Sequence, residues 1–435
     1  MHLKTARAVT ITLSAGAIGA LALSGGAQAS GFALPEASTA GIATANAMVA
    51  NPRELGAIPY NAAAMGLHDN SSIALGGLLI GPSISVSTAS GNHVSNGADW
   101  TAVPMIQAAL KVADRWRVGL GITVPFGLET RWAYGTFPAL SQNMTIPLPA
   151  PLGSVTVPSG NHPTASKLEV LDLAPTVAFK VTDDLSLAAG LDVYWARSAQ
   201  LDSNLGRLSG DGTGLGFNLS AIYRVNALTL GASFHSASTI GLKGDYTPTN
   251  NTLLSLGRLQ PSQSATLDFN LPWRLQLGVR YEFTRDLAAE FDWSYTGWSR
   301  FNRLEVYGDR TGALIFADAN NWSNASAYRL GLTWQVLPQT QLRLGYAYDQ
   351  TGQDNGQFSA RVPDNNRQTI GAGVSQDLGG GYSVAVSYLY VTAGQRNYYS
   401  ATPYTSTSGV NGTDAINGNY KLTANMIGIE IAKTF

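Results

Sequence analysis

The feature that most constrains this chain is an alternation of apolar and polar residues with a period of two. From Leu185 to Trp195 every second residue is apolar, and the residues between them are small or polar. An α-helix cannot place every second residue on one face, whereas a β-strand does so automatically. The chain is therefore predicted to be all-β. The same pattern recurs at residues 273–283, 287–295, 328–334, 342–348 and 384–390.

Counting such segments predicts about 14 strands. Their connections alternate between short turns, such as Asp183-Asp184 and Arg285-Asp286, and long loops rich in Gly, Asn, Ser and Thr, the longest spanning residues 128–166. This alternation is typical of a transmembrane antiparallel β-barrel with periplasmic turns and extracellular loops. The expected strands lie near residues 71–88, 99–113, 116–131, 167–182, 185–200, 213–225, 228–245, 264–284, 287–307, 325–337, 341–351, 367–378, 382–396 and 419–435.

Composition favours the membrane barrel over a soluble β-sandwich or propeller. Charged residues make up only 13% of the chain, and they occupy one face of the alternating segments. The last strand ends in Phe435, and such a C-terminal aromatic resembles the signal for the barrel assembly machinery, which is an expected partner. Tyr and Trp residues near strand ends are expected to form an interfacial girdle. They are Trp195, Trp298, Trp334, Tyr348, Tyr388 and Tyr390.

The N-terminus reads as a secretory signal peptide. Lys4 and Arg7 precede an uncharged apolar run over residues 8–23, and Ala27-Gln28-Ala29 fits the small-x-small cleavage pattern. Residues 1–29 are therefore predicted to be removed, and the mature chain is predicted to begin at Ser30. A retained anchor helix is the alternative, but the run is short and rich in Ala and Gly.

Residues 30–70 do not alternate, and the barrel is assigned to residues 71–435. The segment is rich in small residues, yet Phe32, Leu34, Ile42 and Met65 supply apolar surface that can pack. A barrel of this size has a lumen open to water unless something fills it. We therefore expect residues 30–70 to form a hatch that plugs the lumen. A mobile periplasmic extension is the alternative.

Several motifs resemble the outer-membrane long-chain fatty acid transporter family, which also includes uptake proteins for toluene and related hydrocarbons. Residues 30–41 look like the family's N-terminal hatch, and 60–65 look like its Asn-Pro-Ala motif, with Ala62 where Pro is usual. Residues 119–128 are similar to the family's third strand, and 295–301 and 363–367 to two later motifs. The resemblance implies capture at the extracellular face, transfer to an internal pocket and lateral release through a gap in the wall.

On this reading each step of the route has its expected residues. A strand break is expected at Pro125, Phe126 and Gly127, because Pro lacks an N–H and Gly tolerates irregular backbone. The loop after it either holds an exposed apolar capture platform or folds inward to pack the mouth. The expected residues are Asn61, Ala62, Ala63 and Met65 for the gate, Phe32 and Leu34 for the pocket, Trp132, Phe137, Leu140 and Ile146 for capture, and Arg274 and Arg280 for carboxylate contact or an internal ion-pair lattice.

The sequence also argues against other classes of protein. It has no Cys and a net charge of −1, so that thiolate chemistry and a nucleic-acid footprint are not expected. No His pair has metal spacing and no Gly-x-Ser-x-Gly elbow is present, and we expect no catalytic residue, metal or cofactor. We expect a monomer with both termini periplasmic, carrying long-chain fatty acids. Aromatic hydrocarbon uptake is the alternative, and a general porin or a barrel-embedded lipase is a further one.

Overall fold

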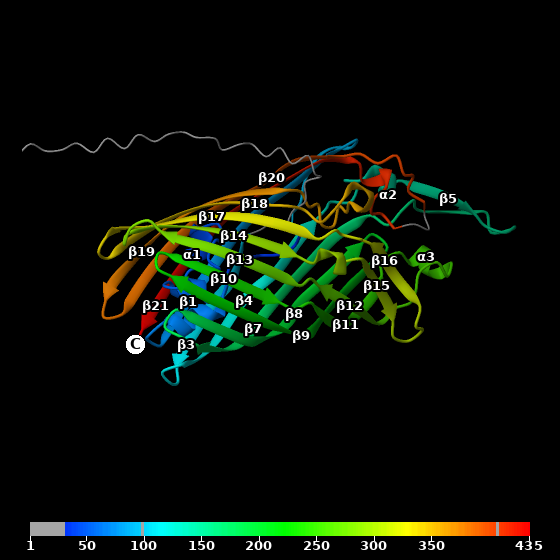
Figure 1. Cartoon of the computed structure of the whole chain (residues 1–435). Coiled ribbons are helices and arrows are strands. Elements are labelled where there is room, and N and C mark those ends of the chain that lie inside the picture. Colours follow the sequence, from blue (N-terminus) through cyan, green and yellow to red (C-terminus); the bar gives the residue numbers. More distant parts are fainter. Residues whose placement is uncertain (1–30, 97–99, 406–408) are drawn as a thin grey trace, which may run out of the picture.

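The computed structural model describes residues 31–96, 100–405 and 409–435. The predicted signal peptide, residues 1–29, lies outside the described residues. The strands form one closed antiparallel barrel of 14 staves (Figure 1), where a stave is one strand or two successive strands that together run the height of the wall. Pairing of β1 (Ser72–Thr88) with β21 (Gly418–Thr434) closes the barrel.

Most staves are single strands. Besides β1 and β21 they are β3 (Thr101–Lys111), β4 (Trp116–Arg131), β7 (Pro163–Lys180), β8 (Leu185–Ser203), β9 (Gly206–Val225), β18 (Thr340–Asp349), β19 (Arg367–Gly379) and β20 (Tyr382–Tyr398). The others are interrupted and consist of β10 (Leu228–His235) with β11 (Ser238–Pro248), β12 (Gln263–Leu271) with β13 (Arg274–Glu282), β14 (Leu287–Thr296) with β15 (Arg303–Gly308), and β16 (Leu314–Ala319) with β17 (Ala325–Leu337).

The remaining elements are short. Three strands lie outside the staves: β2 (Gly91–Val94), β5 (Asn143–Pro147) and β6 (Ser154–Pro158). The helices are α1 (Thr39–Ala43), α2 (Pro138–Ser141) and α3 (Asn251–Ser255), with 3₁₀ turns η1 (Leu55–Ala57), η2 (Ala62–Leu67), η3 (Trp298–Arg300), η4 (Asn355–Gln357) and η5 (Asp414–Ile416). No helix among the described residues is both long and apolar enough to cross a membrane.

The predicted all-β barrel is confirmed, and each of the predicted segments corresponds to a stave. The sequence did not predict the β5–β6 hairpin or β16, and it predicted continuous strands where the structure has interruptions. One interruption falls at Pro272, between β12 and β13, where a residue without an N–H cannot continue the ladder.

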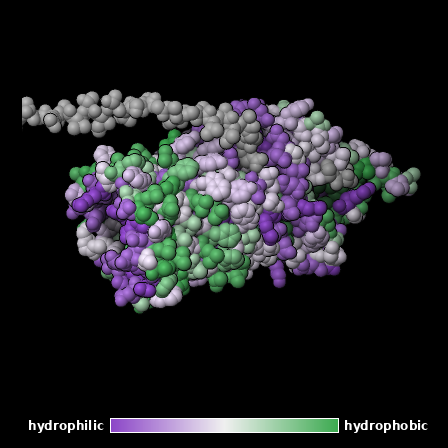
Figure 2. Space-filling view, viewed as in Figure 1, coloured by the Kyte–Doolittle hydropathy of each residue, from purple (hydrophilic) through white to green (hydrophobic). Residues whose placement is uncertain are grey.

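The outer wall carries the apolar face of the alternation. Large apolar side chains such as Leu191, Phe217 and Leu330 are among those exposed. On the face shown in Figure 2, a hydrophobic region lies between more hydrophilic regions toward the two ends of the barrel. So much exposed apolar surface is stable only against lipid. Trp195, Trp334, Tyr388 and Tyr390 lie on this surface, but Trp298 does not: it is fully buried, and its assignment to the girdle was wrong.

Polar side chains line the interior, and the N-terminal segment lies among them. The Asp292 carboxylate accepts hydrogen bonds from the backbone N–H groups of Met48 (2.8 Å) and Val49 (3.0 Å). Glu54 pairs with Arg343 of β18 at 2.6 Å. The segment also lies close against the wall, because a Cβ on Gly345 would come within 2.0 Å of the Thr44 carbonyl carbon. The described residues before β1 are therefore anchored inside the barrel by charge-assisted hydrogen bonds.

Candidate functional site

The hydrogen-bond ladder between β3 and β4 is incomplete. Going away from the short-turn end, the pairing begins at Lys111–Arg117 and ends at Ile106–Ile122. β3 continues to Thr101 along β1, and β4 continues to Arg131, without a pairing between them. Beyond this interval the two sides meet again where the Asn96 N–H donates to the Arg131 carbonyl at 2.9 Å and the Arg131 N–H donates to the Ser95 hydroxyl at 2.8 Å. We call the interval between these two points the seam.

A proline on β3 faces the seam. The Val112 N–H donates to the Trp116 carbonyl across the β3–β4 turn, so the backbone groups of Val112 point toward β4. Every second residue of a strand points its backbone groups to the same neighbour. Pro104 is an even number of residues before Val112, so its backbone also faces β4. Since proline has no N–H, it leaves one donor fewer on an open edge, where an unpaired donor would be costly in lipid. The sequence analysis overlooked Pro104, although a proline inside an alternating strand is itself a sign of an edge.

On the other side of the seam β4 is kinked at the predicted position. Its register with β7 shifts between Thr123 and Phe126. Two backbone groups of β4 at the kink bond to the N-terminal segment. The Leu34 N–H donates to the Pro125 carbonyl at 2.8 Å, and the Gly127 N–H donates to the Phe32 carbonyl at 2.9 Å. Ala33 and Phe126 thus form an isolated antiparallel bridge. Residues 32–34 take the place beside β4 that β3 would otherwise hold.

Phe32 holds this bridge in place through an aromatic cluster. Its exposed fraction is 3%, and its ring centroid lies 4.7 Å from Trp298 and 5.2 Å from Phe301. The rings of Phe126, Phe269 and Trp322 complete the cluster. Edge-to-face contacts of this kind add to the stability from burial alone.

Gly31 precedes Phe32 and fits tightly against the same cluster. Its φ is +62°, and a Cβ there would come within 2.4 Å of the Trp322 ring. Both facts require glycine at this position.

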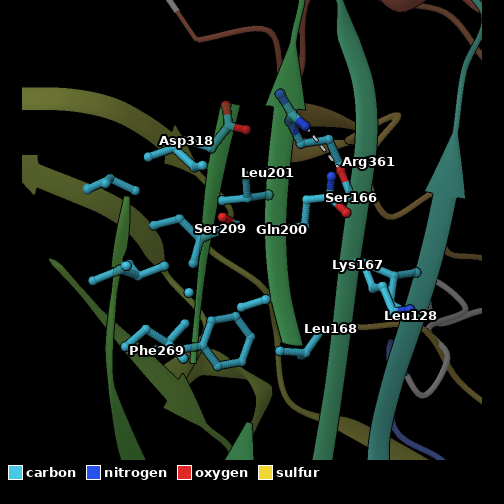
Figure 3. A pocket seen from close by; sticks show the side chains of 18 of the residues that line it. Leu128, Ser166, Lys167, Leu168, Gln200, Leu201, Ser209, Phe269, Asp318 and Arg361 are labelled. Atoms are coloured by element: carbon cyan, nitrogen blue, oxygen red, sulfur yellow. Dashed lines mark hydrogen bonds between the residues drawn. The ribbon is translucent and has the colours of Figure 1, made fainter. Parts of the chain in front are cut away.

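Two cavities meet at the N-terminal segment. The rim cavity, about 90 Å³, lies among β7, β8, β9, β11, β12 and β15 near the long loops, and Phe32 lines it (Figure 3). The seam cavity, about 170 Å³, is lined by Leu34 and by residues from both sides of the seam, including Val103 of β3 and Val124 of β4. Leu128, Lys167 and Leu168 line both cavities, so that the two cavities are neighbours at these residues.

The wall of the rim cavity is mainly apolar, and a buried polar group lies at one end. There the buried Arg361 donates from Nη1 to the Ser166 hydroxyl at 3.1 Å and to the Asp202 carbonyl at 2.9 Å. Asp318 faces the same cavity, with Arg361 and Asp318 at its upper edge in Figure 3. The cavity therefore joins a long apolar wall to a small polar end.

The predicted gate residues lie in the part of the N-terminal segment that is nearer the short turns. The Asn61 side chain caps η2 by accepting from the Ala63 N–H, and it donates to the Val49 carbonyl (2.7 Å) and the Ala221 carbonyl (2.9 Å). Ala62 and Met65 line a smaller cavity of about 40 Å³ beside β4 and β9. Asn61 thus ties three parts of the chain together, and none of these residues lines the rim or seam cavity.

The expected capture loop is mostly not exposed. Trp132, Phe137 and Leu140 are buried in a cluster with Phe358 and Tyr420, and Ile146 on β5 is half-buried. The assignment of Trp132, Phe137 and Leu140 to an exposed platform was wrong, and the alternative of a loop that packs inward holds for these three residues. The assignment of Ile146 stays a prediction. Large apolar residues that remain exposed in this loop are Tyr134, Met144 and Leu152.

Arg274 and Arg280 line neither the rim nor the seam cavity. Arg280 pairs with Glu290 at 3.4 Å, and Arg274 lies beside a cavity of about 20 Å³ behind the N-terminal segment. The ion-pair alternative therefore describes Arg280. The cations that do line the larger cavities are Lys167, Lys243, Arg361 and Arg367. Among the described residues no group of His, Asp and Glu side chains has the arrangement of a metal site.

Fold and site together define a class: a β-barrel of the outer-membrane type whose lumen is filled from within and whose wall has a seam beside an apolar cavity. Comparison with known proteins identifies the family. The chain belongs to the family described as "Outer membrane protein transport protein (OMPP1/FadL/TodX)", which matches residues 20–149 and 139–435.

Individual relatives agree with this assignment. A long-chain fatty acid transport protein of Escherichia coli O6:H1 is 24% identical over 426 residues, covering 87% of this chain and 91% of the relative. The crystal structure of a Pseudomonas aeruginosa FadL homologue has a TM-score of 0.79 at 19% identity and covers 93% of this chain and 100% of its own. The Ralstonia pickettii toluene transporter TbuX has a TM-score of 0.66 at 18% identity, covering 92% and 98%. The chain is thus an outer-membrane protein of a transport family.

Proposed function

We propose that this protein takes up hydrophobic molecules, with long-chain fatty acids as cargo, and releases them sideways through the seam. The observation that carries the proposal is the seam itself, which lies beside a mainly apolar cavity and next to residues 32–34, which bridge to β4. Cargo with little solubility in water gains nothing from an aqueous pore. A route from an apolar cavity directly into lipid keeps it out of water throughout.

The route has three stages. Cargo enters the rim cavity from the long-loop end, which we place outside the cell, with both termini periplasmic. It then passes Phe32 and the shared wall at Leu128 and Leu168 into the seam cavity. Displacement of residues 32–34 from the edge of β4 opens the seam to the membrane. Loss of their two backbone hydrogen bonds is acceptable there, because the edge lines a cavity rather than lipid.

Aromatic hydrocarbon uptake is the second candidate for the cargo. The aromatic rings of Phe32, Phe269 and Phe301 in the wall of the rim cavity favour it, and the related TbuX is a toluene transporter. We further propose that the protein acts as a monomer without catalytic activity. Recognition of Phe435, whose side chain is 69% exposed, by the barrel assembly machinery completes the proposal.

Growth and ligand analysis test the function. A strain lacking the protein should lose growth on oleate, or on toluene for the second candidate, and expression of the chain should restore it. Mass spectrometry of the purified protein should find the corresponding molecule bound. A general porin would show large, stable conductance steps in planar bilayers, whereas a filled barrel should pass little current. Hydrolysis of lipid esters by the protein in micelles would contradict the assignment as a transporter.

A further inference from the structure

We propose that the barrel wall has a second gap, between β12 and β15, through which an amphiphile enters the rim cavity from the extracellular surface of the membrane. The inference rests on the proposed function and specifies the entrance for its cargo. The seam then serves release and the second gap serves entry, so that cargo passes through the barrel wall twice on its way into the lipid.

The ladder between β12 and β15 is short. Going toward the short turns, their register ends at Thr266–Tyr307, although β12 continues to Leu271 and β15 extends back to Arg303. Among the described residues no further pair joins these two strands beyond that point. Pairing resumes between β13 and β14, nearer the short turns. We call the unpaired interval the side gap.

The local sequence explains why the two strands do not pair there. Between β12 and β13 lie only Pro272 and Trp273, whereas the longer stretch 297–302, which includes η3, lies between β14 and β15. The proline has no N–H to donate to a ladder. The extra residues of the longer stretch turn inward, because Trp298 and Phe301 are buried in the aromatic cluster. Both sides of the side gap therefore carry a feature that interrupts a ladder.

Backbone groups of both strands point into the side gap. The Asp309 N–H donates to the Ser264 carbonyl at 2.9 Å, so that the backbone groups of these two residues face each other across the two strands. Alternation along each strand gives Asp268, Asn270 and Glu305 the same direction. These residues belong to no ladder pair between β12 and β15. Unpaired backbone groups are costly in lipid, and the side gap must therefore meet water or a cavity.

The position of the side gap satisfies this requirement. On its short-turn side, half-buried aromatic rings lie on the outer face of β13 and β14, with Tyr295 at 5.6 Å from Trp273 and 5.7 Å from Trp293 between ring centroids. Aromatic residues of this kind gather at the membrane–water interface. At the side gap itself the surface is charged, because Arg303 pairs with Glu305 at 2.8 Å. The side gap therefore opens at the polar boundary of the membrane.

The inner side of the side gap is the apolar wall of the rim cavity. Leu267 and Phe269 of β12 line this cavity from one side, and Leu304 and Val306 of β15 line it from the other. Side chains rather than a ladder close the wall here, and an apolar tail can move them without breaking paired strands. The charged outer edge keeps a headgroup in water while the tail enters. An amphiphile that enters tail first fits both sides.

A label attached after folding tests the entrance. The chain has no native cysteine, so Glu305→Cys places a single thiol at the outer edge of the side gap. A bulky maleimide on the folded protein in micelles should lower the on-rate for oleate roughly tenfold or more. The Kd should change less than about threefold, because an obstructed path slows entry and exit alike. Asp211→Cys, which replaces an exposed acid of β9, is the matched control and should show no effect of the label.

Two alanine variants separate the side gap from the cavity behind it. Leu267→Ala widens the side gap, whereas Leu201→Ala removes the same side chain from the wall of the same cavity at β8. Both variants should raise the off-rate for oleate through lost apolar contact, and Leu267→Ala alone should raise the on-rate.

The outcomes distinguish the entrance from the transport function. If oleate binds but its on-rate is unchanged by the label on Glu305→Cys, or is equal in the two alanine variants, the side gap is not the entrance and the transport function stands. If the unaltered protein does not bind oleate, the proposed function itself fails, and this inference with it.

Discussion

Replacing Phe32 by alanine should loosen the cover of the seam without disturbing the barrel. Phe32 contributes the aromatic ring by which residues 32–34 join the aromatic cluster. Truncation of a buried Phe to Ala usually costs about 3–5 kcal/mol. We take the lower value, about 3 kcal/mol, because the neighbouring Trp298 and Trp322 rings can partly close the space.

The loss of stability in Phe32→Ala affects the state in which residues 32–34 are attached to β4, and it leaves the free energy of the detached state unchanged. A loss of about 3 kcal/mol raises the population of the detached state roughly 100-fold. The Leu34 and Gly127 amides, which donate across the bridge to β4, report detachment directly. Their hydrogen-exchange rates in micelles should therefore rise by about two orders of magnitude in Phe32→Ala.

Two controls make the result interpretable. Phe32→Leu keeps most of the buried area and should raise the rates by less than about tenfold. Amides in the β7–β8 ladder, such as that of Ala189, should not change in either variant. If Leu34 and Gly127 exchange as slowly in Phe32→Ala as in the unaltered protein, Phe32 does not hold the segment and the reasoning is refuted.

Further predictions concern other parts of the chain. Asn61→Ala removes two hydrogen bonds from the side-chain amide, each worth about 1 kcal/mol, and ohmic current in planar bilayers should rise above the low background of the unaltered protein. Gly31→Ala forces a Cβ against Trp322 and should increase Leu34 exchange as Phe32→Ala does; unchanged protection of Leu34 would contradict the need for glycine at this position.

The staves could be predicted from the sequence because each is a local pattern. Alternation in segments such as 185–195 identifies a strand without knowledge of its neighbours, and the lipid-facing set follows from the same period. The kink at Pro125 was visible for the same reason, since it depends on residue types at one place. Interruptions such as the one at Pro272 have a local cause as well, and could have been predicted from the proline.

The contacts that make the site were not predictable in this way. The bridge between Ala33 and Phe126 joins residues far apart in the sequence through backbone atoms alone, which leave no mark on residue types. An exposed platform and an inward-packed loop both call for apolar residues at Trp132 and Phe137. The two alternatives differ in whether distant residues such as Tyr420 pack against these side chains, which the sequence does not show. Alternation predicts which arginines face the lumen, but it does not predict how far along the barrel axis each one lies. The sequence therefore did not show that Arg367 lines the seam cavity whereas Arg280 does not.

Locking residues 32–34 to β4 tests the central claim most directly. Ala33 and Phe126 form a bridge pair without hydrogen bonds between them, whose Cα atoms are typically about 4.5 Å apart, a separation that a disulfide can span. The chain has no native cysteine, so Ala33→Cys with Phe126→Cys introduces the only pair. Uptake of labelled oleate into cells should fall to the level of the strain lacking the protein when the pair is oxidised, and recover on reduction. Equal uptake by the oxidised and reduced forms would contradict lateral release through the seam.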